Sequence, residues 1–400
     1  MQEILDDKFD LVAITLEGLE DTLKAELESC GAKDIGLRTR AVVFKGDKRL
    51  LYYANLKLRT ALKILKPILN FKAKSEYELY ANVRKIEWDK IISIKQTFSI
   101  SSSVYSQIFT HSQYATLKVK DAIADYFVDK YDSRPSVDTD NPDIKIHLHI
   151  YENQCGISLD SSGEILNHRG YRAHSDTAPI NECLAAAMII LSGWDGDCDF
   201  IDPMCGSGTI AIEAAYIARN IAPGLLRDDF GFMSWADFDE PLYEEVYDKT
   251  LEEIKDFNHS IYAFDISQKS IDLSTKNAAI GKVNGDIIFG VQDFLEPINS
   301  PIKNALIMFN PPYGDRMKKD DIDFFYKSIG DSLKKNWIGN TAWIITSNFS
   351  ALKLLGLSTS KKIKLYNGAL ECRFVKYDLY KGSKKTKYSQ NQDSLPEILD

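Results

Sequence analysis

The stretch FIDPMCGSGT at residues 200–209 carries the strongest information on the fold of this chain. It begins with an apolar run that is typical of a buried strand and leads into the apolar helix pattern TIAIEAA. Gly206 and Gly208 allow a strand to turn tightly into a helix while the backbone approaches a ligand. The free amides at the helix N-terminus then favour an anionic group. The stretch therefore predicts a ligand-binding turn at a strand end in an α/β sheet.

From about residue 181 onward, strands alternate with helices, which is the pattern of a parallel sheet. Each predicted parallel strand ends at a polar or charged residue, and the five strands cover residues 199–202, 261–265, 286–292, 305–310 and 341–346. Residues 363–366 and 370–377 flank Asn367 and Gly368, a strong signal for a two-residue hairpin. Five parallel strands closed by an antiparallel hairpin predict a mixed seven-stranded, Rossmann-like sheet. This α/β layout is typical of class I methyltransferases that use S-adenosylmethionine (SAM).

The spacing of glycines and aspartates narrows the choice of ligand. The turn lacks the third glycine of the dinucleotide motif GxGxxG, and the chain has no GK[ST] sequence for nucleoside triphosphates. SAM needs a cradle for its methionine carboxylate and an acid for its ammonium or ribose, and residues 202–209 offer both. Asp265 could hold the ribose hydroxyls, provided that its long separation in sequence from the glycine turn is due to an inserted loop at residues 219–258. Asp293 could reach the adenine amine. Each of these aspartates could instead cap a helix.

Asn310, Pro311, Pro312 and Tyr313 directly follow the apolar strand ALIMF. Two prolines fix the backbone so that a carbonyl projects beyond the strand end. The Asn310 side-chain oxygen and the Pro311 carbonyl could then accept hydrogen bonds from an exocyclic amine, and Tyr313 offers a ring on which a base can stack. The four residues are therefore the predicted catalytic group of an enzyme that methylates an amine. In isolation, the motif could also be a structural Pro-Pro loop.

The composition excludes several classes of protein. The 400 residues, 44% hydrophobic and 27% charged, indicate a globular chain of two or three domains. No run of about 18 apolar residues occurs, and the acidic start MQEILDDKFD lacks a secretory pattern. The six cysteines are scattered without a CxxC pair, which predicts reduced thiols, a cytoplasmic protein and no zinc. We therefore expect neither a membrane partner nor a metal.

The first third of the chain alternates short strands and helices. Predicted strands cover residues 9–15, 35–44, 97–104 and 144–150, and predicted helices cover 20–30, 48–66 and 114–131. Residues 33–95 hold 16 Lys and Arg against 6 Asp and Glu, which gives this stretch a net charge of +10. Since the whole chain has a net charge of −9, the rest of the chain has a net charge of −19. Such a basic zone could face a polyanion. A solvated helix face would explain the charges equally well.

Three long segments resemble the THUMP-domain RNA methyltransferases. They are LNHRGYRAHSDTAPINECLAAAMIILSGW at residues 166–194, DPMCGSGTIAIEAAYIARNIAPGL at 202–225 and NPPYGDR at 310–316. The resemblance covers nearly the whole chain and is closest to the N-terminal guanine-N2 module of the bacterial large-subunit ribosomal RNA enzymes. It implies a ferredoxin-like segment at residues 1–65, a THUMP domain that binds RNA at 66–165, a methyltransferase domain at 166–385 and a polar tail at 386–400.

The same resemblance implies the residues of the site. Catalysis would fall to Asn310, Pro311, Pro312 and Tyr313. The residues implied for SAM binding are Pro179, Asn181, Asp202, Met204, Cys205, Gly206, Ser207, Gly208, Thr209, Asp265, Ile266, Asp293 and Phe294.

The function that the resemblance implies is SAM-dependent formation of N2-methylguanosine in RNA, with 23S ribosomal RNA or its assembly particle as the partner. Three alternatives stay open at this point. The first is a tRNA guanine-N2 methyltransferase with the same domains. The second is a DNA adenine-N6 methyltransferase, because the NPPY motif serves that amine equally well. The third is a non-catalytic RNA-binding assembly factor, against which the intact motifs argue.

Overall fold

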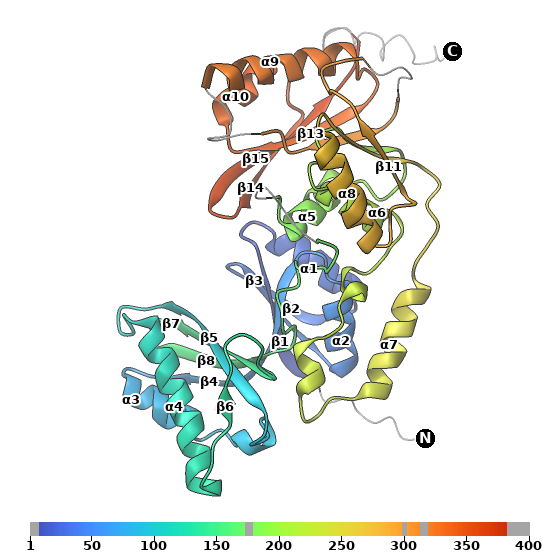
Figure 1. The fold of residues 1–400 in the computed structure, drawn as a ribbon. Coiled ribbons are helices and arrows are strands. Elements are labelled where there is room, and N and C mark those ends of the chain that lie inside the picture. Colours follow the sequence, from blue (N-terminus) through green and yellow to red (C-terminus); the bar gives the residue numbers. More distant parts are fainter. Residues whose placement is uncertain (1–7, 173–178, 298–301, 313–318, 382–400) are drawn as a thin grey trace, which may run out of the picture. The chain divides into compact units, whose positions relative to one another are not determined.

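The computed structural model describes residues 8–172, 179–297, 302–312 and 319–381. The chain divides into two compact units (Figure 1). The first unit comprises residues 1–170 together with 221–254, and the second comprises 171–220 together with 255–400.

The first unit is built on an eight-stranded sheet with the order β2-β3-β1-β4-β8-β7-β5-β6. Its first half holds β1 (Phe9–Thr15), α1 (Glu20–Ser29), β2 (Lys33–Arg38), β3 (Ala41–Gly46), α2 (Lys48–Lys57) and β4 (Ala61–Lys72). Its second half holds α3 (Glu76–Val83), β5 (Thr97–Tyr105), α4 (Ser112–Tyr131), β6 (Ser136–Val137), β7 (Ile144–Tyr151) and β8 (Gln154–Asp160). The predicted α+β pattern of the N-terminal third is confirmed.

Two predicted elements of this region are wrong. The single strand expected at residues 35–44 is a hairpin of β2 and β3, which turns at Arg40 with φ of +56°. The helix expected at 48–66 begins where Asp47 accepts a hydrogen bond from the Leu50 amide at 2.8 Å, but it ends at Lys57. The chain then enters β4, which lies between β1 and β8. Pairing on both sides outweighs the helical periodicity of this stretch, and a register shift accommodates Pro67 inside the strand.

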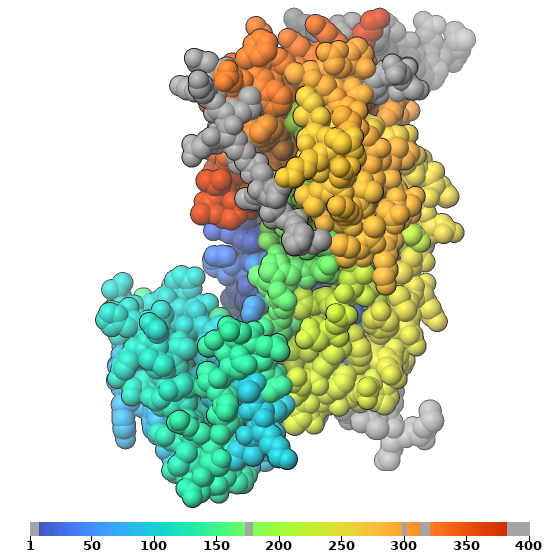
Figure 2. Space-filling view, in the orientation of Figure 1, coloured from blue at the N-terminus to red at the C-terminus, as the bar shows by residue number. Residues whose placement is uncertain are grey.

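The segment expected as an inserted loop at residues 219–258 is largely helical. It forms two 3₁₀ turns, Pro223–Leu226 and Gly231–Ser234, followed by α7 (Glu240–Glu252). Residues 221–254 fold with the first unit although they interrupt the second in sequence. The Arg227 guanidinium donates to the Ser162 and Glu164 carbonyls at 3.0 and 3.1 Å. Figure 2 shows yellow-green atoms of the insertion at the surface beside green atoms.

Aromatic packing anchors the insertion. Phe232 is fully buried, and its ring lies 4.5 Å from the Tyr52 ring and 5.6 Å from the Tyr243 ring between centroids. At Gly224, a Cβ atom would come within 2.7 Å of the Leu56 Cα, so only glycine permits this approach to α2. Arg49 of α2 makes a bidentate contact with Glu245 of α7, at 2.9 and 2.8 Å. The insertion is therefore part of the core of the first unit.

Replacing Phe232 with alanine is expected to destabilise this unit by about 3–5 kcal/mol, because the change removes a buried ring and leaves a cavity. Urea denaturation followed by circular dichroism would measure the loss. Leu251→Ala is the control, since Leu251 lies on α7 of the same insertion but is 41% exposed. Equal midpoints for the two variants would contradict the view that the insertion belongs to this core.

The second unit contains a seven-stranded sheet with the order β11-β10-β9-β12-β13-β15-β14, which confirms the predicted fold class. The parallel strands are β9 (Phe200–Asp202), β10 (Ile261–Asp265), β11 (Ile287–Val291), β12 (Leu306–Phe309) and β13 (Thr341–Thr346). The antiparallel strands β14 (Lys361–Asn367) and β15 (Leu370–Asp378) form the predicted hairpin. The helices are α5 (Glu182–Ser192), α6 (Thr209–Ala218), α8 (Gln268–Ile280), α9 (Lys319–Lys335) and α10 (Phe349–Leu354).

The strand order reverses at β9. Strands β10 and β11 follow on one side of β9, and β12 and β13 follow on the other. Where the strand order of an open α/β sheet reverses, the chain connections run to opposite sides and leave a crevice at the carboxyl ends of the strands. Ligands of such sheets bind in this crevice. The candidate site is therefore expected beyond β9 and β12.

Candidate active site

The turn after β9 is held against the neighbouring strand β10. The Gly206 amide donates to Asp265 Oδ2 at 3.0 Å, and the Cys205 amide donates to the Phe264 carbonyl at 2.9 Å. Gly206 and Gly208 adopt φ angles of +53° and +84°, which L-residues with side chains rarely reach. The two glycines serve different purposes. A Cβ atom at Gly208 would lie 2.8 Å from the Ser274 Cβ, whereas one at Gly206 would meet nothing within 4 Å.

A cavity of about 340 Å³ lies at the carboxyl ends of the parallel strands, directly beyond this turn. Of the residues predicted for the site, it is lined by Pro179, Met204, Cys205, Gly206, Ser207, Thr209, Asp265, Ile266, Asp293, Phe294, Asn310 and Pro312. The glycine turn, two strand-end aspartates and the beginning of the Asn310 motif thus meet in one space, although they are far apart in sequence.

Five residues of the predicted site are not among the cavity-lining residues. Asn181 caps α5, where its Oδ1 accepts hydrogen bonds from the Cys183 and Leu184 amides at 2.9 and 3.3 Å. Gly208 faces α8 rather than the cavity, and Pro311 and Asp202 are buried beside it. Tyr313 lies outside the described residues.

Six lining residues are not among the residues that were predicted individually for SAM binding or catalysis. They are Ile180, Pro203, Ile210, Ser270, Gln292 and Phe325. Gln292 and Pro203 lie at strand ends next to the predicted residues Asp293 and Asp202. This position could have indicated from the sequence that they line the cavity. Phe325 lies on α9, and nothing in its local sequence indicates that the fold brings it to this cavity.

The Asp202 carboxyl is fully buried behind the turn. Burial raises its pKa well above the usual range, the nearby Asp265 charge raises it further, and the Met204 amide acts in the opposite direction. The side chain does not line the cavity, and neither carboxyl oxygen has a hydrogen-bond partner among the described residues, so its role in SAM binding stays a prediction.

The Cys205 thiol is also buried, and burial raises its pKa. Its Sγ lies 3.9 Å from the Ser274 hydroxyl. A thiol of this kind remains protonated near neutral pH, which suits packing rather than nucleophilic attack.

Asn310 brings an available acceptor to the cavity. Its Oδ1 is shielded from solvent and has no hydrogen-bond partner within the part of the chain that the structure describes. A buried amide oxygen without a donor costs free energy, so such a group is commonly kept for a ligand. An exocyclic amine would supply the missing donor.

The residues present fit SAM. The Asp265 and Asp293 carboxylates at the ends of β10 and β11 are suited to hydroxyl and amine donors. Ile266 is 70% exposed beside Asp265 and offers an apolar surface for a flat ring. The open space in front of Gly206 lets a ligand approach the backbone, and α6 begins directly after the turn. SAM supplies an electrophilic methyl group when it is bound.

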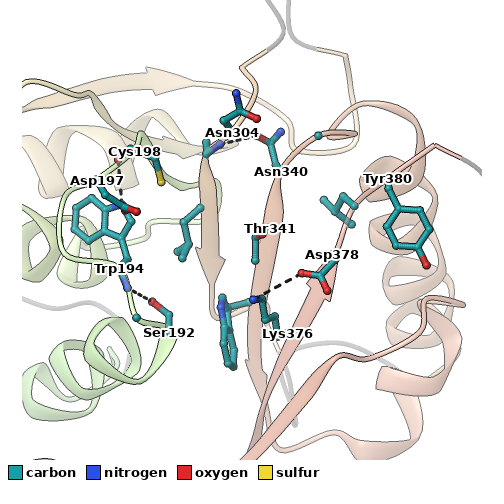
Figure 3. A pocket seen from close by; sticks show the side chains of 16 residues that line it. Ser192, Trp194, Asp197, Cys198, Asn304, Asn340, Thr341, Lys376, Asp378 and Tyr380 are labelled. Carbon is teal, nitrogen blue, oxygen red and sulfur yellow. Dashed lines mark hydrogen bonds and ion pairs between the residues drawn. The ribbon is translucent and has the colours of Figure 1, made fainter. Parts of the chain in front are cut away.

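A second cavity, of about 410 Å³, lies at the opposite end of the same sheet (Figure 3). It is lined by residues that precede β9, β12 and β13, including Trp194, Asn304 and Asn340. Asn340 Oδ1 accepts a hydrogen bond from the Ala305 amide at 2.9 Å, and the Trp194 ring nitrogen donates to the Cys198 carbonyl at 3.0 Å. These polar groups already serve the structure, and the cavity lies at the amino ends of the parallel strands. It is therefore not the candidate site.

A glycine turn open to a cavity at the reversal point of a seven-stranded mixed sheet defines the class I SAM-dependent methyltransferases. Comparison with known proteins agrees. Residues 169–376 match the UPF0020 family, described as "RMKL-like, methyltransferase domain", residues 73–160 match the THUMP domain, and residues 10–65 match the RlmL ferredoxin-like domain.

Individual relatives share most of the chain. "Putative RNA methyltransferase slr0064" of Synechocystis sp. is 36% identical over 92% of this chain and 96% of its own length. "Ribosomal RNA large subunit methyltransferase K/L" of Syntrophotalea carbinolica is 34% identical over 94% of this chain, which spans 54% of that protein. The crystal structure of SMU.472, "a putative methyltransferase complexed with SAH", superposes with a TM-score of 0.84 at 28% identity, over 94% of this chain and 99% of that one.

The chain therefore belongs to the RMKL-like (UPF0020) family of THUMP-domain SAM-dependent methyltransferases and is homologous to the N-terminal part of the K/L enzymes. The predicted family and the predicted cofactor SAM are confirmed. The THUMP domain implies an RNA substrate. Within the described ranges, no helix is long and apolar enough to cross a membrane, and no cluster of three His, Cys, Asp or Glu side chains could hold a metal.

Proposed function

We propose that this protein transfers the methyl group of SAM to the exocyclic N2 amine of a guanine in 23S ribosomal RNA. The observation that supports this most directly is the buried, unpartnered Asn310 Oδ1, which lines the same cavity as Gly206 and Asp265. An acceptor in this position matches the hydrogens of an amine at the reacting centre.

The proposed role of the Asn310 motif is to bind and polarise the amine. The guanine amine is a poor nucleophile because its lone pair is delocalised into the ring. Hydrogen bonds from the amine to the Asn310 oxygen and the Pro311 carbonyl favour its pyramidal geometry and direct the lone pair away from the ring plane. These contacts are stronger in the transition state than in the planar ground state, so they act on the rate of chemistry. Tyr313 is proposed to stack on the extruded base.

The proposed SAM-binding residues remain those predicted from the motif match. In this proposal, Asp265 accepts hydrogen bonds from the ribose hydroxyls and Asp293 accepts from the adenine amine. Both line the cavity, as do Gly206, Ser207 and Thr209 beside α6. Gly208 would act by shaping the turn.

RNA, and ribosomal RNA in particular, is supported by three features. The THUMP match lies in the N-terminal region, that region contains the stretch with a net charge of +10, and one relative is named as a ribosomal RNA large subunit methyltransferase. We propose the domain limits 1–65, 66–165 and 166–385 for the ferredoxin-like, THUMP and methyltransferase parts. The six free thiols support a cytoplasmic location.

The substrate is tested by offering the purified protein labelled SAM together with 23S ribosomal RNA, tRNA or DNA from a strain that lacks the corresponding gene. We expect incorporation into 23S RNA from that strain and little into the same RNA from the parent strain, which already carries the modification. Incorporation into tRNA alone would replace the ribosomal assignment. Incorporation into DNA alone would overturn the RNA function.

A further inference from the structure

The strands of the THUMP domain present two different faces. On β7, Ile146 and Leu148 are buried on the face that carries α3 and α4. On the neighbouring strand β5, Ser102 belongs to this same face, because the Thr116 hydroxyl of α4 donates to the Ser102 hydroxyl at 2.9 Å. Figure 1 shows α3 and α4 beside β4, β5, β7 and β8. Since side chains alternate along a strand, Tyr151 points to the other face.

An exposed row of side chains crosses four strands on that other face. Lys72 of β4 pairs with Gln154 of β8, Gln154 pairs with Tyr151 of β7, and Tyr151 pairs with Tyr105 of β5. Register partners point to the same side of a sheet. Tyr105 and Tyr151 are 61% and 63% exposed, and neither ring stacks on another aromatic side chain of the described residues. The two rings are therefore neighbours with open surfaces.

The next row on this face is polar. It consists of Asn70, Gly156, His149 and Ser103 on the same four strands. Asn70 Oδ1 lies 3.0 Å from the place that a Cβ atom of Gly156 would take, so the Asn70 amide covers this glycine and adds a polar group to the face. Burial lowers the pKa of His149, so its neutral ring can both donate and accept.

The strand ends that carry the tyrosines are tied together. The Glu152 amide donates to the Tyr105 carbonyl at 2.8 Å, and the Ser106 hydroxyl donates to the Glu152 carbonyl at 2.7 Å. Tyr151 immediately precedes Glu152 in the tight turn between β7 and β8. The backbone positions of the two tyrosines are thus fixed relative to each other, and ligand binding has to order only their side-chain torsions.

We propose that this face, the tyrosine face formed by Lys72, Tyr105, His149, Tyr151 and Gln154, binds unpaired nucleotides of the RNA substrate by stacking bases on Tyr105 and Tyr151. The proposal rests on the proposed RNA function and names the surface and the kind of RNA that it recognises. Aromatic rings accept the face of any base, so this site contributes affinity for single strands with little sequence preference.

The polar members of the face complete the site. The Lys72 ammonium has no carboxylate within 4.0 Å among the described residues, so it is available to a phosphate. Gln154 and His149 flank Tyr151 and can form hydrogen bonds with base edges or ribose hydroxyls. Paired RNA conceals its base faces and should gain little from the two rings.

The test compares the affinities of full-length variants for a short fluorescein-labelled single-stranded RNA of mixed sequence, measured by fluorescence anisotropy. Tyr105→Ala/Tyr151→Ala should weaken binding on the order of tenfold for each ring removed. Tyr105→Phe/Tyr151→Phe keeps both rings and should bind as the wild type does. The same RNA in a perfect duplex should show little difference between these proteins.

Tyr77→Ala is the matched control, because Tyr77 is 79% exposed but lies on α3 in the same domain. Loss of affinity in Tyr77→Ala equal to that of the double alanine variant would overturn the assignment to the tyrosine face. Wild-type RNA affinity in Tyr105→Ala/Tyr151→Ala would also overturn the assignment. In that case the tyrosine face would be a candidate surface for binding another protein. If the wild-type chain binds no RNA of any kind, the proposed RNA function fails, and this inference fails with it.

Discussion

Asn310→Ala is expected to lose methyl transfer by a factor of a hundred or more while it binds SAM normally. The substitution removes an acceptor that is shielded from solvent and has no partner within the described structure. Loss of one such contact at a reacting centre typically costs about 3 kcal/mol of transition-state stabilisation. SAM is expected against Gly206 and Asp265, which this change leaves in place.

The measurement is single-turnover transfer from labelled SAM to RNA that lacks the modification, together with SAM affinity by calorimetry. Asn258→Ala serves as the control, because Asn258 is an exposed asparagine of the same unit that precedes β10. It should react at the wild-type rate. A near wild-type rate in Asn310→Ala would remove this side chain from the mechanism.

Gly206→Val is expected to weaken SAM binding roughly tenfold to a hundredfold, on the scale of the 1–3 kcal/mol that overpacking costs. A Cβ atom at Gly206 would meet no protein atom within 4 Å, so the added side chain would extend into the cavity where SAM is expected. The backbone there has a φ of +53°, which adds strain to the same substitution.

Gly193→Val separates backbone strain from obstruction of the site. Gly193 has a φ of +83°, and a Cβ atom there would likewise meet nothing within 4 Å, but it lines the cavity at the other end of the sheet. Gly193→Val should lower the stability of the fold as Gly206→Val does, but it should bind SAM with the wild-type affinity. Unchanged SAM affinity in Gly206→Val would contradict the assignment of this cavity to SAM.

The catalytic fold was predictable because its signals are local. Strands β10 and β13 have the predicted bounds, since each is a short apolar run that ends at a polar residue. The hairpin of β14 and β15 follows from Asn367 and Gly368, which favour a tight turn. The glycine turn and the Asn310 motif each follow such a strand, so their meeting in one cavity follows from the parallel topology.

The errors arise where distant parts of the chain decide the structure. Residues 48–66 have a helical pattern, but residues 61–65 pair with β1 and residues 65–72 pair with β8, and this pairing makes residues 61–72 a strand. The insertion at residues 221–254 packs its aromatic side chains around Tyr52, a partner that no local pattern reveals. Phe325 likewise reaches the cavity only through the placement of α9.

The most direct test of the central claim is the identity of the methylated nucleoside. RNA from a strain lacking the gene would be incubated with the protein and SAM that carries a deuterated methyl group, digested to nucleosides and examined by mass spectrometry. The proposed chemistry predicts that the deuterated methyl appears in N2-methylguanosine. Its appearance in N6-methyladenosine would contradict the guanine assignment, and its absence from every nucleoside would contradict the proposed activity itself.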